Sequence, residues 1–133
     1  MLNIRRETDY AIKLLKKLGD SKGEVKSLNE ISQDTKISFL FLQKIARKLR
    51  LAGLIEAHQG VEGGYRLKVD AKKISLKKII EATEGKCCIL ACENEDKNIK
   101  CCPKDTNPEL QKKLSKINKK IVKILEQTKL SQL

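Results

Sequence analysis

The chain has 133 residues and a formal net charge of +12, from 29 Lys and Arg against 17 Asp and Glu. This excess favours a polyanionic partner, and few aromatic rings are present for stacking on single-stranded bases, so duplex DNA is the expected polyanion. No run approaches the roughly 18 apolar residues that span a bilayer. The first residues also lack the apolar segment of a signal peptide, so a cytoplasmic protein with no membrane partner is expected.

Three helices are expected in the first part of the chain. Apolar residues at helical spacing predict a helix over residues 4–18, closed by a glycine. A second is predicted over residues 28–34, because Ser27 and Glu30 have the spacing of a capping box. A third, capped by a serine, is predicted over residues 39–52, and all of its charged side chains are cationic.

A hairpin and two more helices follow. Residues 54–58 and 65–68 read as short strands joined by a glycine-bearing turn. Residues 76–83 are predicted to form a helix that a glycine stops. The last helix begins with a proline in its first turn. Its apolar residues recur at spacings of 4, 3, 4 and 3, the pattern of a packing seam between helices: Leu110, Leu114, Ile117, Ile121 and Ile124.

These elements predict a mainly α fold with a small β wing. A winged helix-turn-helix domain is expected over residues 1–85, a cysteine-rich loop over residues 86–106, and a dimerisation helix with its tail over residues 107–133. A long helix with one apolar seam needs a partner for that seam. Pairing with a second copy would match a palindromic operator, and packing on the chain's own domain is the alternative.

The third predicted helix is the candidate DNA-reading element. The second helix of a helix-turn-helix enters the major groove, and a glutamine there can bond adenine through two hydrogen bonds. The residues of this helix expected to face DNA, the last of them at phosphates, are Ser38, Phe39, Phe41, Gln43, Lys44 and Arg47. An ordinary three-helix domain with a solvated basic face is the competing interpretation.

Several segments resemble one family of bacterial regulators. They are residues 27–31 (SLNEI), 41–45 (FLQKI), 49–55 (LRLAGLI) and, above all, 60–67 (GVEGGYRL), which is similar to the wing motif R-G-x-x-G-G-Y-x-L. On these segments the chain is identified as a member of the Rrf-two family, which includes IscR-, NsrR-, RirA- and CymR-type regulators. The resemblance implies a homodimeric winged-helix transcription factor that, in many members, holds an iron–sulfur cluster in the cysteine loop.

The wing departs from the family pattern at one position. Where the family commonly has an arginine before the first wing glycine, this chain has Gln59. A minor-groove arginine is therefore not expected there, and His58 or Arg66 is the candidate to compensate. The wing residues expected at DNA are His58, Gln59, Gly60 and Arg66.

All five cysteines lie between residues 87 and 102, in a polar stretch. Cysteines clustered there have little core to fill, which favours metal or redox chemistry. An odd number in a reducing compartment disfavours a disulfide framework. The spacing matches no recognised ferredoxin or zinc pattern, so an iron–sulfur cluster, a zinc site and a metal-free thiol switch all stay open.

The resemblance makes the cluster the leading hypothesis. Cys92 stands where the family has its first ligand, and Cys101 or Cys102 matches the second. By the same resemblance the third position falls on Asn107, so a further cysteine would have to be recruited. The candidate ligands are Cys92, Cys101, Cys102, Cys88, Cys87 and, as an NsrR-type carboxylate from the other subunit, Asp9. For Asp9, an acid that complements the helix dipole is the alternative.

An enzyme is not expected. The single histidine lies in the predicted wing, no C-x-x-C pair occurs, and no glycine-rich phosphate loop precedes a helix. The expected function is a homodimeric DNA-binding regulator that senses iron–sulfur, redox or nitric-oxide status. A cluster-free repressor gated by cysteine oxidation, zinc or a regulatory protein partner, as in CymR-type members, is the alternative.

Overall fold

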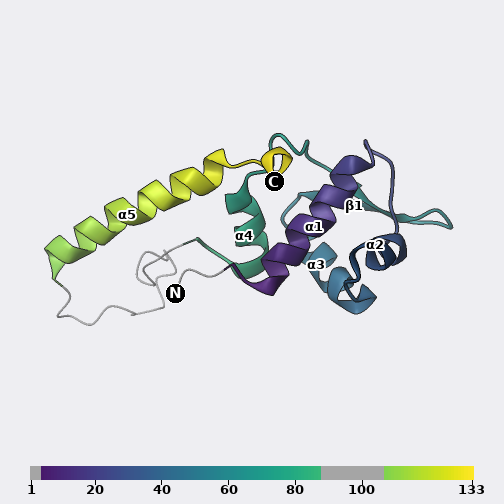
Figure 1. The fold of residues 1–133 in the computed structure, drawn as a ribbon, viewed down its shortest axis with the longest axis horizontal. Helices are drawn as coiled ribbons and strands as arrows, with labels where there is room; N and C mark the ends of the chain where they lie inside the picture. The colour runs from purple at the N-terminus through teal and green to yellow at the C-terminus, as the bar shows by residue number, and fades with distance from the viewer. Residues whose placement is uncertain (1–3, 88–106) are drawn as a thin grey trace.

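The computed structural model describes residues 4–87 and 107–133, and it is mainly helical with one two-stranded sheet. The predicted fold class is confirmed. In chain order the elements are α1 (Arg6–Asp20), α2 (Leu28–Thr35), α3 (Phe39–Leu51), β1 (Ile55–His58), β2 (Gly64–Leu67), α4 (Leu76–Glu84), α5 (Pro108–Gln127) and the 3₁₀ turn η2 (Leu130–Gln132). Figure 1 shows α5 and the β1–β2 hairpin projecting at opposite ends of the molecule.

Local capping explains where most of the helices begin. Side chains of Ser27, Ser38, Ser75 and Asn107 accept hydrogen bonds from backbone amides at the starts of α2, α3, α4 and α5. At α2 the predicted capping box is complete, because Glu30 also bonds the backbone amide of Ser27 at 3.2 Å. Helix α1 differs from expectation at both ends, since it begins at Arg6 without a side-chain cap and continues through Gly19 to Asp20.

The core lies where α1 meets α3 and α4. Helix α1 packs against α3, α4 and β2, and α3 packs against α2, α4 and β1. The buried apolar side chains contributed by these helices include Ala11, Leu14, Leu15, Leu18, Ile31, Leu42, Ile45, Ala46, Leu49 and Ile79. Removing this apolar surface from water is the main favourable term in folding.

The hairpin is held close to the rest of the domain by backbone contacts. Strands β1 and β2 pair antiparallel from Ile55 opposite Leu67 to His58 opposite Gly64. The backbone of Lys26 exchanges two hydrogen bonds of 2.9 Å with Tyr65, which ties the segment before α2 to β2. A Cβ at Gly64 would overlap the carbonyl of Lys26, so the close approach requires glycine there.

The end of helix α5 is anchored by the segment that follows it. The segment after it returns to the start of α4, where the Leu76 amide bonds the Thr128 carbonyl at 2.8 Å and the Leu130 amide bonds the Ile74 carbonyl at 2.9 Å. Leu130 joins the core, a contact that the sequence analysis did not anticipate. Farther from this anchor, the seam residues Leu110, Ile117 and Ile124 remain 50–61% exposed in the single chain.

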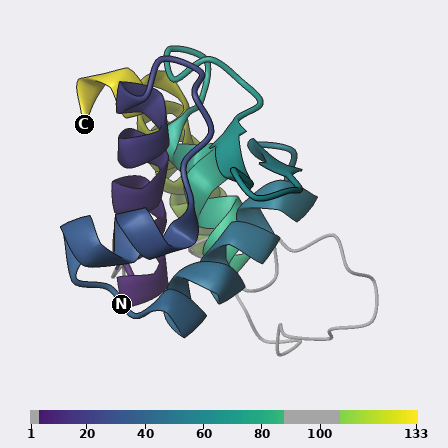
Figure 2. The ribbon, with the colours of Figure 1, turned by 90° about the vertical axis from the view of Figure 1, so that its right-hand side faces the viewer.

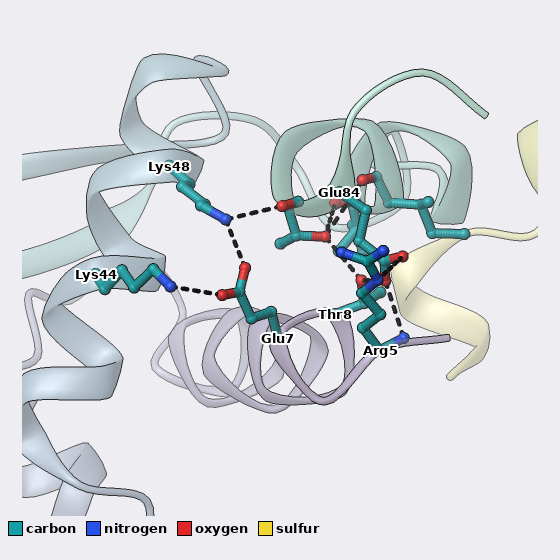
Figure 3. Close-up of polar contacts among 9 residues, drawn as sticks. Arg5, Glu7, Thr8, Lys44, Lys48 and Glu84 are labelled. Carbon is teal, nitrogen blue, oxygen red and sulfur yellow. Dashed lines mark hydrogen bonds and ion pairs between the residues drawn. The ribbon is translucent and has the colours of Figure 1, made fainter. Parts of the chain in front are cut away.

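A set of polar side chains joins α1, α3 and α4, and we call it the three-helix polar cluster (Figure 3). The buried hydroxyls of Thr8 and Thr83 lie 2.7 Å apart, and Thr8 also donates to the carboxylate of Glu84. Because each buried hydroxyl has a partner, the cluster avoids the cost of an unsatisfied polar group. Its members are Arg5, Glu7, Thr8, Lys44, Lys48, Thr83 and Glu84.

Glu7 carries the electrostatic part of this cluster. One carboxylate oxygen accepts from Lys44 Nζ at 2.7 Å and the other accepts from Lys48 Nζ. The hydrogen bond from Lys44, followed by that from Lys48, lowers the pKa of Glu7 from 4.5 to about 2. Two cations of α3 are thereby drawn to α1.

We expect Glu7→Gln to destabilise the fold at neutral pH by on the order of 1–2 kcal/mol, with solvent screening allowed for. Because the folded-state pKa is depressed, the contribution of Glu7 is fully present above the unfolded value of 4.5. It is lost as the pH falls toward about 2. Urea unfolding of both proteins across this range measures the difference.

The matched control for this prediction is Glu7→Gln introduced into a chain that already carries Lys44→Met and Lys48→Met. There the pH-dependent part of the difference should vanish, because its cause has been removed. An unchanged pH dependence in that background would show that the two lysines do not stabilise the Glu7 carboxylate.

Candidate nucleic-acid interface

Burial of one side of α3 decides which of its residues meet solvent. Leu42, Ile45, Ala46 and Leu49 are fully buried at helical spacing. Residues out of phase with them lie on the open side. Of the predicted DNA-facing residues, these are exposed, the first two at the start of the helix: Ser38, Phe39, Gln43, Lys44 and Arg47.

The tight turn between α2 and α3 sets the start of this surface. Lys36 adopts a left-handed conformation with φ of 58° and its amide bonds the Ser32 carbonyl at 3.0 Å. The Ser32 hydroxyl then bonds the Ile37 carbonyl at 2.6 Å. With Ser38 capping α3, these contacts form the turn of a helix-turn-helix.

Phe41 differs from its predicted neighbours on α3. Its ring is partly buried and meets the Tyr10 ring of α1 edge-on, with centroids 5.3 Å apart. Lys44 Nζ lies 5.8 Å from the Phe41 centroid while it is paired with Glu7. Phe41 therefore joins the packing between α1 and α3, whereas Gln43 and Arg47 remain in the open.

Leu40 was missed by the sequence analysis. It lies in the first turn of α3 and is 75% exposed. Its position, out of phase with the buried set that starts at Leu42, is the signal that would have found it. An apolar side chain at this end of the helix suits contact with a thymine methyl group.

The wing carries a group of interacting charged and ionisable side chains. The carboxylate of Glu56 accepts from Arg66 Nε, and His58 Nε2 lies 3.4 Å from the same oxygen. Glu56 and Arg66 are paired across the two strands, which puts the three side chains on one face of the hairpin. The hydrogen bond from Arg66, followed by that from His58, lowers the pKa of Glu56.

The wing tip is glycine-rich for steric reasons. Gly60 has a φ of 120°, and its carbonyl accepts from the Gly63 amide at 3.0 Å. A Cβ at Gly63 would lie 2.6 Å from the His58 carbonyl oxygen. Gln59 and Gly60 are exposed, and so is the apolar side chain of Val61, which the sequence analysis did not single out.

Helix α3 and the wing are joined by a short, well-bonded connection. Gly53 has a φ of 74°, and the next amide, of Leu54, bonds the Leu49 carbonyl at 3.0 Å. Figure 2 shows the hairpin next to the end of α3, and β1 packs against that helix. The open side of α3 and the wing therefore keep a set orientation relative to each other.

Most of the candidate ligands lie outside the described residues: Cys88, Cys92, Cys101 and Cys102. Cys87 is partly buried just after α4. Asp9 is exposed in the first turn of α1, where it pairs with Lys13 Nζ at 2.8 Å. Within residues 4–87 and 107–133, no group of three His, Cys, Asp or Glu side chains is arranged to hold a metal ion. None of the helices in these ranges has the length and apolar character needed to cross a bilayer.

Comparison with known proteins agrees with the helix-turn-helix geometry described above. The profile of the Rrf2 family, described as iron-dependent transcriptional regulators, matches residues 4–133. The HTH-type transcriptional regulator NsrR of Shouchella clausii is 30% identical over 92 residues, which cover 68% of this chain and 62% of that protein. The HTH-type transcriptional regulator IscR of Cereibacter sphaeroides is 44% identical over 64 residues, which cover 48% and 41%. The chain thus covers less than two thirds of the length of these relatives.

Solved structures share the fold. CymR, the global cysteine regulator of B. subtilis, superimposes with a TM-score of 0.79 at 25% identity, covering 99% of this chain and 95% of that one. IscR of T. potens superimposes with a TM-score of 0.71 at 23% identity, covering 98% and 85%. With the family profile matched along almost the whole sequence, the chain belongs to the Rrf2 family of transcriptional regulators.

Proposed function

We propose that the chain acts as a homodimer on a palindromic DNA operator and changes its affinity in response to chemistry at the cysteine-rich segment, residues 86–106. The observation that carries the DNA-binding part is the open side of α3, which exposes Gln43, Lys44 and Arg47 beside the wing. A role on chromosomal DNA places the protein in the cytoplasm. The matched relatives are named as regulators, and no enzymatic role is proposed.

The proposed contacts divide between bases and phosphates. Gln43 is exposed near the start of α3, where its amide would bond the edge of an adenine in the major groove. Ser38, Phe39 and Lys44 would lie at the same groove, and Arg47 would bind a phosphate. On the wing, His58, Gln59, Gly60 and Arg66 would follow the neighbouring phosphates or minor groove.

We expect Gln43→Ala to weaken operator binding by about 10- to 100-fold, because one bidentate base contact is worth roughly 1–3 kcal/mol. Affinity for unrelated DNA should hardly change, since that term comes from phosphate contacts. Fluorescence anisotropy at one salt concentration, with operator and scrambled duplexes, measures both. Gln127→Ala, at the exposed end of α5, is the matched control and should leave both affinities unchanged. Equal operator affinity for the two variants would remove Gln43 from the interface.

The dimer proposal rests on the exposed seam of α5. Leu110, Ile117 and Ile124 are spaced seven residues apart, and each is at least half exposed in the single chain. Apolar side chains at this spacing form one stripe along a helix, and water contact with such a stripe is unfavourable. A second copy of α5 would cover it and would relate two α3 helices by a two-fold axis.

We expect Ile117→Glu to convert the dimer to a monomer at micromolar concentration, because the charge would be buried without a partner. Sedimentation velocity measures the change. The neighbouring Lys116→Glu inverts a charge on an exposed residue beside the stripe and should leave the dimer intact. A wild-type monomer, or two variants with the same sedimentation coefficient, would contradict the proposed seam.

For the sensor, an iron–sulfur cluster is the favoured occupant of the cysteine-rich segment. The family description names iron, and thiolates are the usual cluster ligands. The proposed ligands are Cys92, Cys101 and Cys102, with Cys88 or Cys87 as alternates, and Asp9 of the other subunit as the fourth. Zinc, cysteine oxidation and a regulatory protein partner are the competing modes.

Protein purified without oxygen should therefore absorb visible light and contain iron and acid-labile sulfide. Cys92→Ser should lose most of this absorption and also the difference in operator affinity between loaded and unloaded protein. Ser115→Ala, in α5, is the control that should preserve both. A colourless protein that contains zinc, or one with five titratable thiols, would rule out the cluster.

A further inference from the structure

Lys48 occupies an unusual place for a cation of the DNA-reading helix. It lies one turn after Lys44 on α3, yet its side chain points to α1 and α4 instead of to the open side (Figure 3). Its ammonium donates to the carboxylate of Glu7 on α1 and to the carbonyl of Thr83 on α4, the latter at 2.9 Å. One charged group thus joins three helices.

The carbonyl of Thr83 needs such a donor. Helix α4 ends at Glu84, so carbonyls of its last turn have no amide partner within the helix. A cation placed there satisfies the carbonyl and complements the negative end of the helix dipole. Lys48 of α3 therefore caps the C-terminus of α4.

The same end of α4 is held by α1 from the other side. The Thr83 hydroxyl contacts that of Thr8, and the Glu84 carboxylate accepts from Thr8 and from the Arg5 amide, the latter at 3.0 Å. Gly85 follows with a φ of 94°, and its amide still bonds the Glu81 carbonyl at 3.2 Å. Any rearrangement of the chain that continues from residue 85 must act on this anchored end.

We propose that Lys48 is a positioning residue that transmits the state of the α4 C-terminus to the DNA-reading side of α3, through the carboxylate it shares with Lys44. The inference rests on the proposed function, because it names the route by which the cysteine-rich segment would regulate α3. Glu7 has two oxygens and two ammonium partners. When Lys48 follows Thr83 away from Glu7, the carboxylate binds Lys44 more strongly and competes with DNA for it. When Lys48 stays in place, Glu7 is shared and Lys44 is more available.

A purely structural role for Lys48 would give a different pattern of effects in the variants below. Comparing Lys48→Met with Lys48→Arg separates a structural role from the proposed coupling role. Lys48→Met keeps most of the side-chain length but loses the charge and the donors, whereas Lys48→Arg keeps both. Glu84→Gln perturbs the α4 end without touching Lys48, since Glu84 bonds only the α1 side of the cluster in the contacts described above. Lys77→Met, on the side of α4 that faces α5, is the matched control.

The first measurement needs no DNA. In the full chain, Glu84→Gln should shift the backbone amide resonances of residues 38–47 in two-dimensional ¹H–¹⁵N spectra. The same change should leave those resonances unmoved in the Lys48→Met background, and should move them again in the Lys48→Arg and Lys77→Met backgrounds. Shifts of equal size with and without the Lys48 ammonium would overturn the proposal.

The second measurement is the affinity of the same variants for operator DNA. Glu84→Gln should change operator affinity by about threefold or more in the wild-type background and by less than about twofold in the Lys48→Met background, the signature of coupled residues. Equal changes in both backgrounds would also overturn the proposal. A wild-type chain that fails to distinguish operator from scrambled DNA would instead defeat the proposed function, and the amide resonances would still decide whether Lys48 couples α4 to α3.

Discussion

Burial of one stripe of α3 against α1 and α4 is the constraint on which the rest of the structure depends. Leu42, Ile45 and Leu49 have no exposed surface, so α3 cannot rotate about its axis without exposing them. This fixed orientation of α3 turns Gln43 toward solvent and Lys48 toward the C-terminal end of α4. The proposed surface for DNA and a polar link to α4 thus follow from a single packing arrangement.

Part of the positive charge behind the net value of +12 is engaged in ion pairs at the candidate interface. Two acids pair with cations that lie at the candidate interface. Glu7 pairs with Lys44, and Glu56 pairs with Arg66 and lies near His58. The more exposed pair of Glu56 with Arg66 contributes little to stability, but each pair orients its cation and sets how much of the charge remains for a phosphate. The acids therefore tune the interface that the lysines and arginines create.

The sequence predicted those features that depend on neighbouring residues. Ser27 and Ser38 cap helices as expected, because a cap needs only an oxygen side chain at the right spacing. The contacts of Glu7 with Lys44 and Lys48 join residues 37 and 41 positions apart, and no local pattern reveals such pairs. The burial of Leu130 and the edge-on contact of Phe41 with Tyr10 were missed for the same reason.

Helix α4 has polar connections near both of its ends, and their surroundings differ. At its start, Lys77 pairs with Glu126 of α5 at 2.6 Å, with the glutamate side chain half exposed. At its end, Lys48 donates to the Thr83 carbonyl and also pairs with Glu7, whose side chain is less than a quarter exposed. Water and salt screen the first pair more than the second, so displacement of the α4 end costs more at α3 than at α5. In the proposed dimer, a signal that enters at residue 85 is therefore expected to act first on α3 within each subunit, and only then on the spacing between subunits.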